Sequence, residues 1–263
     1  MGCGIGAAMM GMKPIVELMF ADFVSVCFDG IINQAAKIHF MSRGQFGINL
    51  VVRLPGGGGD GMGPQHSQSL ESMFMGIPGL CVVSPSNAYD AKGLLKASIN
   101  RGQPVVFFEN RKLYRTRGPV PEGEYEIPLG KGNRVREGKD LTIVAVAYMV
   151  RLAEKVADTL KRANGIEVDI IDPRTLVPLD EELIASSVKR TGRLAILEEG
   201  PVRGGVGSEI AGIVSEKYLD FLDHPIQRIG SRNIPIAASL PLETETLPNE
   251  ESIYRDICRF FSF

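Results

Sequence analysis

The sequence lacks an excess of positive charge and any long hydrophobic run. With 29 Lys and Arg against 31 Asp and Glu, its formal net charge is −2 at pH 7, so no long-range positive field would gather nucleic acid or anionic lipid. No segment approaches the roughly 18 to 20 consecutive apolar residues of a membrane-spanning helix, and no basic, serine-rich leader precedes the first periodic segments. We therefore expect a cytoplasmic protein with neither nucleic acid nor a membrane among its partners.

Cysteine is also scarce, and its spacing matches no common metal or disulfide motif. The four residues, Cys3, Cys27, Cys81 and Cys258, lie within apolar runs, and none forms a CxxC or CxxH pair. This pattern is typical of reduced thiols in a protein interior. What the sequence does have is 44% hydrophobic residues over 263 positions, enough for two packed cores.

Short β-rich runs alternate with segments of helical period, which predicts an α/β fold with a parallel, doubly wound sheet. Helices are expected over residues 22–41 and 87–100, where apolar positions recur at helical spacing. The expected strands of the first half are 15–20, 50–54, 80–84 and 105–109.

A stretch rich in Pro, Gly and charged residues over 115–140 interrupts this alternation, and a second α/β unit follows. We place the boundary near Asn133, which gives domains 1–133 and 134–263. The second unit is expected to contain a helix over 149–164 and strands over 141–147, 167–171 and 194–197.

The glycine-rich turn after the last of these strands matches part of a dinucleotide-binding fingerprint. Ile210 stands in place of the third glycine, however, and no acidic residue follows at the required distance. We interpret Gly204, Gly205 and Gly207 as glycines that let a helix pack closely on its strand.

The N-terminal residues 2–12 are rich in Gly, Ala and Met, as in a helix packed closely on a sheet, yet no strand precedes them. Parallel strands are joined by strand, helix, strand crossovers. We therefore expect the first domain to lack its first strand, which either belonged to the ancestral domain or is supplied by another chain.

The candidate site is a glycine-rich loop over 56–67 that carries His66. In parallel α/β sheets ligands bind beyond the carboxyl ends of the strands, and this loop follows a predicted strand. Its glycines would let the backbone approach a ligand, and His66 is a candidate for proton transfer. His39 and His224 have no comparable setting, and we interpret them as structural.

Asp60 and Asn87 offer an alternative, because carboxylate and amide oxygens at this separation imitate the magnesium and diphosphate motif of thiamine enzymes. Ala88 stands where that motif has a second Asn. We therefore expect no metal site in this chain.

Seven short runs lie in a fixed order along nearly the whole chain: 35–37 (AAK), 44–46 (GQF), 65–69 (QHSQS), 77–80 (IPGL), 90–95 (DAKGLL), 127–130 (IPLG) and 174–180 (RTLVPLD). Together they resemble the β subunit of the thiamine-diphosphate-dependent decarboxylating component of 2-oxo acid dehydrogenase complexes, which include pyruvate, branched-chain 2-oxo acid and acetoin dehydrogenases. That family has a pyrimidine-binding domain followed by a transketolase C-terminal domain.

The resemblance implies a function and partners. It implies oxidative decarboxylation of a 2-oxo acid with transfer of the acyl unit to the lipoyl group of an acyltransferase core. Two α and two β chains form a heterotetramer, in which the α subunit holds the diphosphate through Mg²⁺ and the β subunit contacts the aminopyrimidine. His66 matches the catalytic histidine, and Phe23 matches the aromatic residue that packs on the pyrimidine. A buried core position is the alternative for Phe23.

Three departures from the family pattern accompany the resemblance. The glutamate that activates the pyrimidine is expected just before Met1, so the chain resembles a β subunit truncated at its N-terminus. Gly30 replaces a common Gln, which indicates relaxed constraint or a local packing demand. Some family members bind a structural potassium ion near the positions of Leu50 and residues 98–103, and Arg101 here replaces an acid that is usual at that site. A catalytically impaired paralogue that acts as a structural partner, and an acetoin dehydrogenase subunit, stay open as alternatives.

Overall fold

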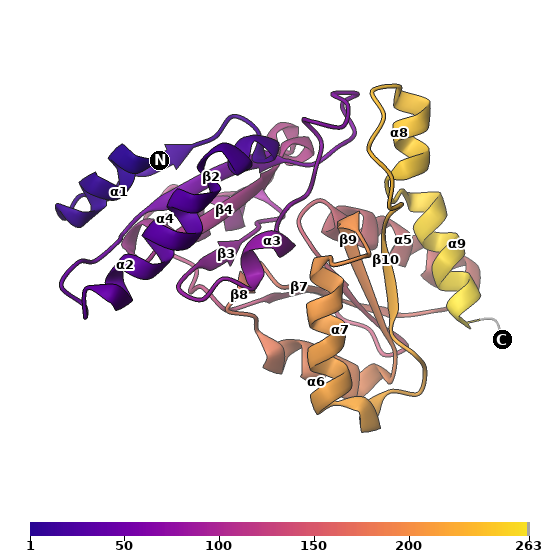
Figure 1. Cartoon of the computed structure of the whole chain (residues 1–263). Coiled ribbons are helices and arrows are strands. Elements are labelled where there is room, and N and C mark those ends of the chain that lie inside the picture. Colours follow the sequence, from indigo (N-terminus) through magenta and orange to yellow (C-terminus); the bar gives the residue numbers. More distant parts are fainter. Residues whose placement is uncertain (262–263) are drawn as a thin grey trace.

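The computed structural model describes residues 1–261, which form two α/β units, each built on a five-stranded sheet (Figure 1). The first sheet has the order β1-β2-β4-β3-β8. Its strands are β1 (Ile15–Glu17), β2 (Val51–Gly56), β3 (Cys81–Val83), β4 (Val105–Asn110) and β8 (Thr175–Val177). The first four run parallel, and β8 is antiparallel to β3.

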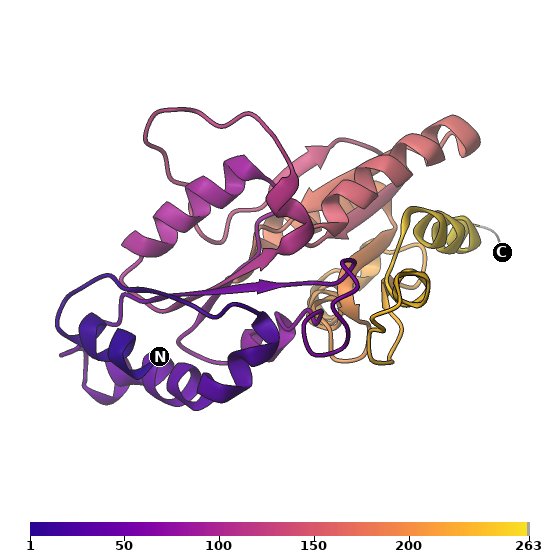
Figure 2. The same cartoon turned by 90° about the horizontal axis from the view of Figure 1, so that it is seen from above.

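Both faces of the first sheet are covered, because successive side chains of its strands point to opposite sides. On β2 and β4, Val51 and Phe107 pack beneath α4 (Ala88–Asn100), whereas Val52 and Phe108 belong to the core on the other face. Figure 2 shows α4 on one side of this sheet and the N-terminal helices on the other. This second group comprises α1 (Gly2–Met9), η1 (Ala21–Cys27), η2 (Gly30–Ala35), α2 (Ala36–Met41) and the short α3 (Ser72–Met75). The sheet is therefore doubly wound, as the sequence predicts.

The expected continuous helix over 22–41 is wrong in its detail. The segment divides into a 3₁₀ helix, a π-helix and an α-helix, and the preceding strand ends at Glu17 rather than at residue 20. A Cβ on Gly30 would lie only 2.9 Å from Cγ of Met1. The glycine therefore lets the N-terminal end of the chain cross η2 closely, which favours the packing explanation for Gly30.

The second sheet has the order β10-β9-β6-β7-β5. Its strands are β5 (Asn133–Arg136), β6 (Leu141–Ala145), β7 (Val168–Asp172), β9 (Leu194–Pro201) and β10 (Gln227–Ser231). One face packs on α5 (Met149–Asn164) and α9 (Glu250–Phe261), and the other on α6 (Glu181–Thr191) and α7 (Val206–Lys217). Two 3₁₀ turns, η3 (Arg111–Arg115) and η4 (Leu219–Phe221), and α8 (Leu240–Thr246) complete the described elements.

Gly207, the second residue of α7, allows this helix to pack closely on β9. A Cβ on Gly207 would lie 2.8 Å from a carboxylate oxygen of Glu198 and 3.2 Å from Ile196. The Gly207 N–H donates to that Glu198 carboxylate at 3.0 Å. The packing interpretation is confirmed for Gly205 and Gly207, whereas at Gly204, with φ of +64°, nothing lies within 4 Å of an added Cβ.

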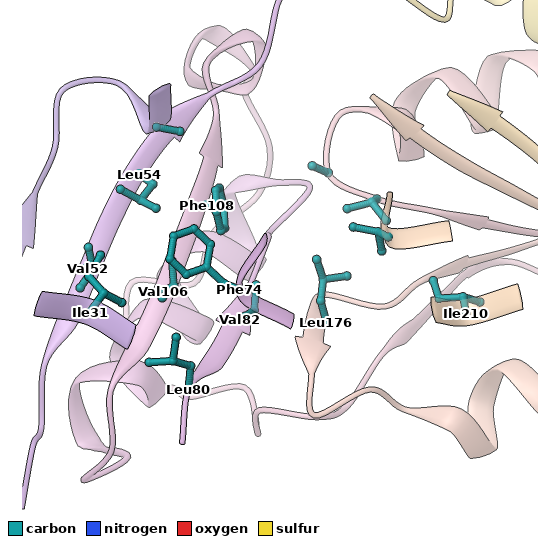
Figure 3. Packing of buried hydrophobic residues seen from close by; sticks show 14 of the residues in the cluster. Ile31, Val52, Leu54, Phe74, Leu80, Val82, Val106, Phe108, Leu176 and Ile210 are labelled. Atoms are coloured by element: carbon teal, nitrogen blue, oxygen red, sulfur yellow. The ribbon is translucent and has the colours of Figure 1, made fainter. Parts of the chain in front are cut away.

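The two units share one core because β8, which lies beyond the predicted boundary, pairs with β3 of the first sheet at Val82 and Val177. In Figure 3, Leu176 on β8 faces the group formed by Phe74, Val106 and Phe108, and Ile210 lies on the side of the second unit. Residues from both units thus belong to one buried cluster.

Among the described helices, none combines the length and apolar character needed to cross a bilayer.

Candidate functional site

Three rings gather at the carboxyl end of the first sheet: Phe20, Phe23 and His66. The His66 ring centroid lies 4.7 Å from that of Phe20 and 5.2 Å from that of Phe23, and both contacts are edge to face. Phe23 is 40% exposed, so its interpretation as a buried core residue is wrong. His66 is half-buried, and the cluster therefore presents one open aromatic face beside an imidazole.

The local fold explains how residues from two segments meet. β1 ends early, so Phe20 stands at the start of η1 rather than within a strand. The side-chain amide of Gln68 donates to Asp22 at 2.8 Å, and this bond connects η1 to the segment that follows His66. The second carboxylate oxygen of Asp22 is buried and has no hydrogen-bond partner within residues 1–261.

Hydrogen bonds to two carboxylates of the second unit hold residues 56–67, which we call the histidine loop. Gly58 N–H donates to Glu199 at 2.8 Å. Gly59 and Gly61 N–H donate to the two oxygens of Glu243 at 2.6 and 2.8 Å. Because these donors are already bonded to carboxylates, the loop does not act as an open backbone cradle for phosphate.

Glu199 is buried, with 7% exposure, and connects both units at this point. It also accepts from the side chains of Ser69 at 3.3 Å and Asn110 at 3.2 Å, and Lys112 lies 3.9 Å away. A buried charge of this kind requires several partners. The carboxyl ends of β2, β4 and β9 therefore meet at one polar centre.

Two neighbouring carboxyl groups have strongly shifted acidities. Burial raises the pKa of Glu198 to about 7, opposed by hydrogen bonds from the backbone at the start of α7. Burial also raises the pKa of Glu71 to about 7, and the charges of Glu199 and Glu198 add to the shift. Clusters of this kind are common at functional sites and at structural contacts alike.

The oxygens of Asp60 and Asn87 have other roles in the structure. Asn87 caps α4, accepting from Asp90 N–H at 2.8 Å, and its amide donates to the Asp90 carboxylate at 2.7 Å. Asp60 lies 3.8 Å from Arg111. Among the described residues, no group of three or more His, Cys, Asp or Glu side chains is arranged to hold a metal ion.

The other two histidines lie elsewhere. His39 Nδ1 is 3.0 Å from the Phe46 carbonyl oxygen near the end of α2, and His224 packs edge to face on Phe260 at 5.7 Å. Both contacts fit structural roles.

Sequence reasoning missed four residues of this site: Phe20, Arg111, Glu199 and Glu243. Glu199 could have been found, because it lies on the last strand that precedes the glycine turn of the second unit, and the rule about strand ends applies there too. Glu243 lies on the short helix α8, and no local sequence pattern marks it as a residue of the site.

Two protein-family profiles match this chain. The transketolase pyrimidine-binding domain matches residues 1–117, and the transketolase C-terminal domain matches residues 130–253. A solved structure, a split-gene transketolase described as an inactive β4 tetramer, superposes with a TM-score of 0.80 at 25% identity, covering 99% of this chain and 80% of that one. The fold and site thus define a two-domain, transketolase-like protein.

Similar curated proteins identify the family within this transketolase-like class to which the chain belongs. The β subunit of acetoin:2,6-dichlorophenolindophenol oxidoreductase from Bacillus subtilis is 46% identical over 96% of this chain and 74% of its own length. The 2-oxoisovalerate dehydrogenase subunit β of the same organism is 43% identical, over 91% and 73%. The pyruvate dehydrogenase E1 component subunit β of Rickettsia conorii is 42% identical, over 96% and 77%. The chain belongs to the family of E1 β subunits of pyruvate, branched-chain 2-oxo acid and acetoin dehydrogenases.

Proposed function

We propose that this chain is the β subunit of a thiamine-diphosphate-dependent 2-oxo acid dehydrogenase and forms half of a site shared with an α subunit. The observation that carries the proposal is the open cluster of Phe20, Phe23 and His66 at the carboxyl ends of the strands. The family assignment supports the same reading.

The residues present fit the aminopyrimidine half of the cofactor. The exposed ring of Phe23 offers an apolar face for a flat heterocycle, and the unpartnered buried oxygen of Asp22 beside it is an available acceptor. The loop donors are already bonded to Glu199 and Glu243. The diphosphate and its Mg²⁺ are therefore assigned to the α subunit.

When bound, thiamine diphosphate supplies the electron sink that permits loss of carbon dioxide from a 2-oxo acid. In this chain, His66 Nε2 or Nδ1 would hold or move a proton near the reacting carbon. Phe20 and Phe23 fix the plane of the imidazole by edge contacts. The loop bonds to Glu199 and Glu243 hold the segment that carries His66 in one place.

The proposed assembly contains two α and two β chains, with the acyl unit passing to a lipoyl-bearing acyltransferase in the cytoplasm. The split-gene transketolase of similar fold is described as inactive in its β4 form, which supports a site that a second kind of chain completes. A potassium ion near Leu50 and residues 98–103 stays a prediction, as do the acetoin activity and the impaired-paralogue alternative.

Replacing His66 with Ala tests the site assignment. In a complex with a cognate α chain, we expect H66A to lower kcat for thiamine-dependent acyl transfer by roughly 10²- to 10⁴-fold, while the complex still forms. The measurement is reductive acylation of a lipoyl domain, together with analytical ultracentrifugation. His39→Ala is the control and should retain activity. Equal activity of H66A and the unmodified complex would remove His66 from the mechanism.

A further inference from the structure

A cavity of about 520 Å³ is lined by residues of η3 and of the first two turns of α5, so both units contribute to it. Its volume falls within the roughly 300 to 1,000 Å³ that is usual for small-molecule sites. Asp60 is the one carboxylate that lines it, and five lining residues are cationic: Arg111, Lys112, Arg115, Arg151 and Lys155. On a chain whose net charge is −2, these cations produce a local positive potential.

Much of this charge lacks a close counterion. The side chains of Arg115 and Arg151 form no ion pair with any residue of the described range 1–261. Arg111 is 3.8 Å from the Asp60 carboxylate, a distance too long for a hydrogen bond. The folded chain therefore retains positive charge in the cavity that a bound anion could neutralise.

The first two turns of α5 are unfavourable for the cations that they carry. The first turn contains no acidic residue, whereas Arg151 lies in it and Lys155 follows four residues later. The positive end of the helix dipole and the like charge at this spacing both disfavour Arg151. Glu250 pairs with Lys155, but no carboxylate of the described residues pairs with Arg151. Local conflicts of this kind are common at functional sites, and an anion bound here would relieve both repulsions.

Two of the cations are already held in position. The Arg111 side chain is 11% exposed, donates to the Gly57 carbonyl at 2.9 Å and lies 5.0 Å from the centre of the Phe20 ring. Its buried Nε has no acceptor in the described part of the chain, although buried donors are normally paired. The Lys112 ammonium lies 4.7 Å from the centre of the Tyr148 ring. A ligand would therefore spend little free energy on ordering these two side chains.

We propose that this cavity binds a small molecule that carries two or more phosphate groups. Cations from both η3 and α5 exceed what a singly charged anion would neutralise, and the arginine fork matches phosphate oxygens in a bidentate geometry. Nucleoside diphosphates and inorganic polyphosphates share this chemistry. Tyr114, which also lines the cavity and is 57% exposed, offers a ring face for a base. The lining residues do not include His66, and the proposal does not depend on the proposed function.

Calorimetric titration of the full chain tests the site with four probes at constant ionic strength: tripolyphosphate, ADP, adenosine and citrate. We expect tripolyphosphate and ADP to bind at a single site. Adenosine, which has no charge, and citrate, whose charge lies on carboxylates, should bind at least about tenfold more weakly. Tighter binding of ADP than of tripolyphosphate would indicate a nucleotide, and the reverse order would indicate a polyphosphate.

The double variant Arg115→Gln, Arg151→Gln should raise the dissociation constant of tripolyphosphate by about tenfold or more. Both side chains are unpaired in the folded chain, so the thermal midpoint of unfolding should change little. The matched control is Arg162→Gln, Arg259→Gln, which removes the same charge near the end of α5 and on α9 and should bind like the unmodified chain.

A second variant keeps the test decisive if the Gln substitutions lower stability. Arg115→Lys, Arg151→Lys retains the charge and loses only the bidentate fork, so its binding should be intermediate between the unmodified chain and the Gln variant. The proposal is wrong if tripolyphosphate shows no saturable binding up to about 1 mM. Equal loss in the Gln variant and its control, or binding of citrate as tight as that of tripolyphosphate, would also overturn it.

The same titration in the complex with a cognate α chain, saturated with thiamine diphosphate and Mg²⁺, distinguishes a ligand site from a subunit contact. Tripolyphosphate should still bind, and the Gln variant should again weaken it. Loss of binding on assembly would mean that the α chain covers these cations, and the proposal would then be wrong. Thiamine-dependent turnover of the complex tests the proposed function separately.

Discussion

At the scale of single residues, buried carboxyl groups distinguish this protein. Glu198 is 3% exposed and Asp172 is fully buried, and burial raises the pKa of each to about 7. Ser86 donates to Asp172, and this bond opposes the shift. Both groups lie on the second sheet where it meets the first unit, so their protonation is linked to the stability of that junction.

The ionisation of Glu198 should make the folded chain less stable as the pH rises. Its carboxyl pKa is higher in the folded chain, at about 7, than the ordinary value of 4.5. Between these two values the folded state retains a proton that the unfolded state has released, so stability falls as the pH rises. We expect Glu198→Gln to remove this contribution, so that the variant gains stability relative to the unmodified chain from pH 5 to pH 8.

The measurement for Glu198→Gln is chemical denaturation at intervals across this pH range. Glu209→Gln serves as the control, because Glu209 lies on α7 beyond the glycine turn and its side chain is exposed; this substitution should leave the pH profile unchanged. Parallel profiles for Glu198→Gln and the unmodified chain would contradict the prediction.

At the scale of elements, the turn before β3 depends on one glycine. Gly79 has φ of +99°, and a Cβ there would lie 2.1 Å from the carbonyl oxygen of Ala36 on α2. The turn therefore passes directly over the helix backbone, and Lys37 of that helix donates to the Pro78 carbonyl. Neither the dihedral angle nor the space admits a side chain.

Gly79→Ala should therefore lower the free energy of unfolding by about 2 to 4 kcal/mol, because it combines left-handed strain with a backbone clash. Gly76→Ala is a matched control three residues earlier, where φ is −85° and nothing lies within 4 Å of the added Cβ. Urea denaturation of both variants checks the prediction. Equal stability of the two would show that α2 moves aside at little cost.

At the scale of the whole molecule, the second unit holds the histidine loop of the first. Figure 1 shows the loop after β2 reaching toward α8, where Glu243 accepts from Gly59 and Gly61. Glu199 adds a third bond at Gly58. The geometry of the candidate site therefore depends on how the two units are assembled.

Replacing Glu243 with Ala should release this loop without unfolding the chain. We expect amide exchange of Gly59 and Gly61 to accelerate by about tenfold or more, which corresponds to the loss of about 1.4 kcal/mol of protection. Glu245→Ala is the control, since its side chain is 72% exposed and pairs with Arg232 at 3.4 Å. Hydrogen exchange with mass spectrometry resolves the loop, and unchanged exchange in the Glu243 variant would mean that the bonds do not hold it.

The sequence by itself determined the alternation of strands and helices and the two α/β units, and it is the source of the prediction that His66 is catalytic. These features depend on local periodicity, on glycine-rich turns and on family-specific runs, all of which are visible within short windows of sequence. The division of residues 22–41 into three kinds of helix was not visible there, because close packing of the N-terminal end on Gly30 influences it.

Only the tertiary structure decided what surrounds His66. Glu199 and Glu243 lie 141 and 184 residues from the glycines that they bond, and β8 joins a sheet formed mainly by residues before Asn133. Arg115 of η3 and Arg151 of α5 likewise line one cavity, although no periodic pattern connects these two helices. Contacts at such separations follow from the packing of one unit on the other, and local sequence patterns do not encode that packing.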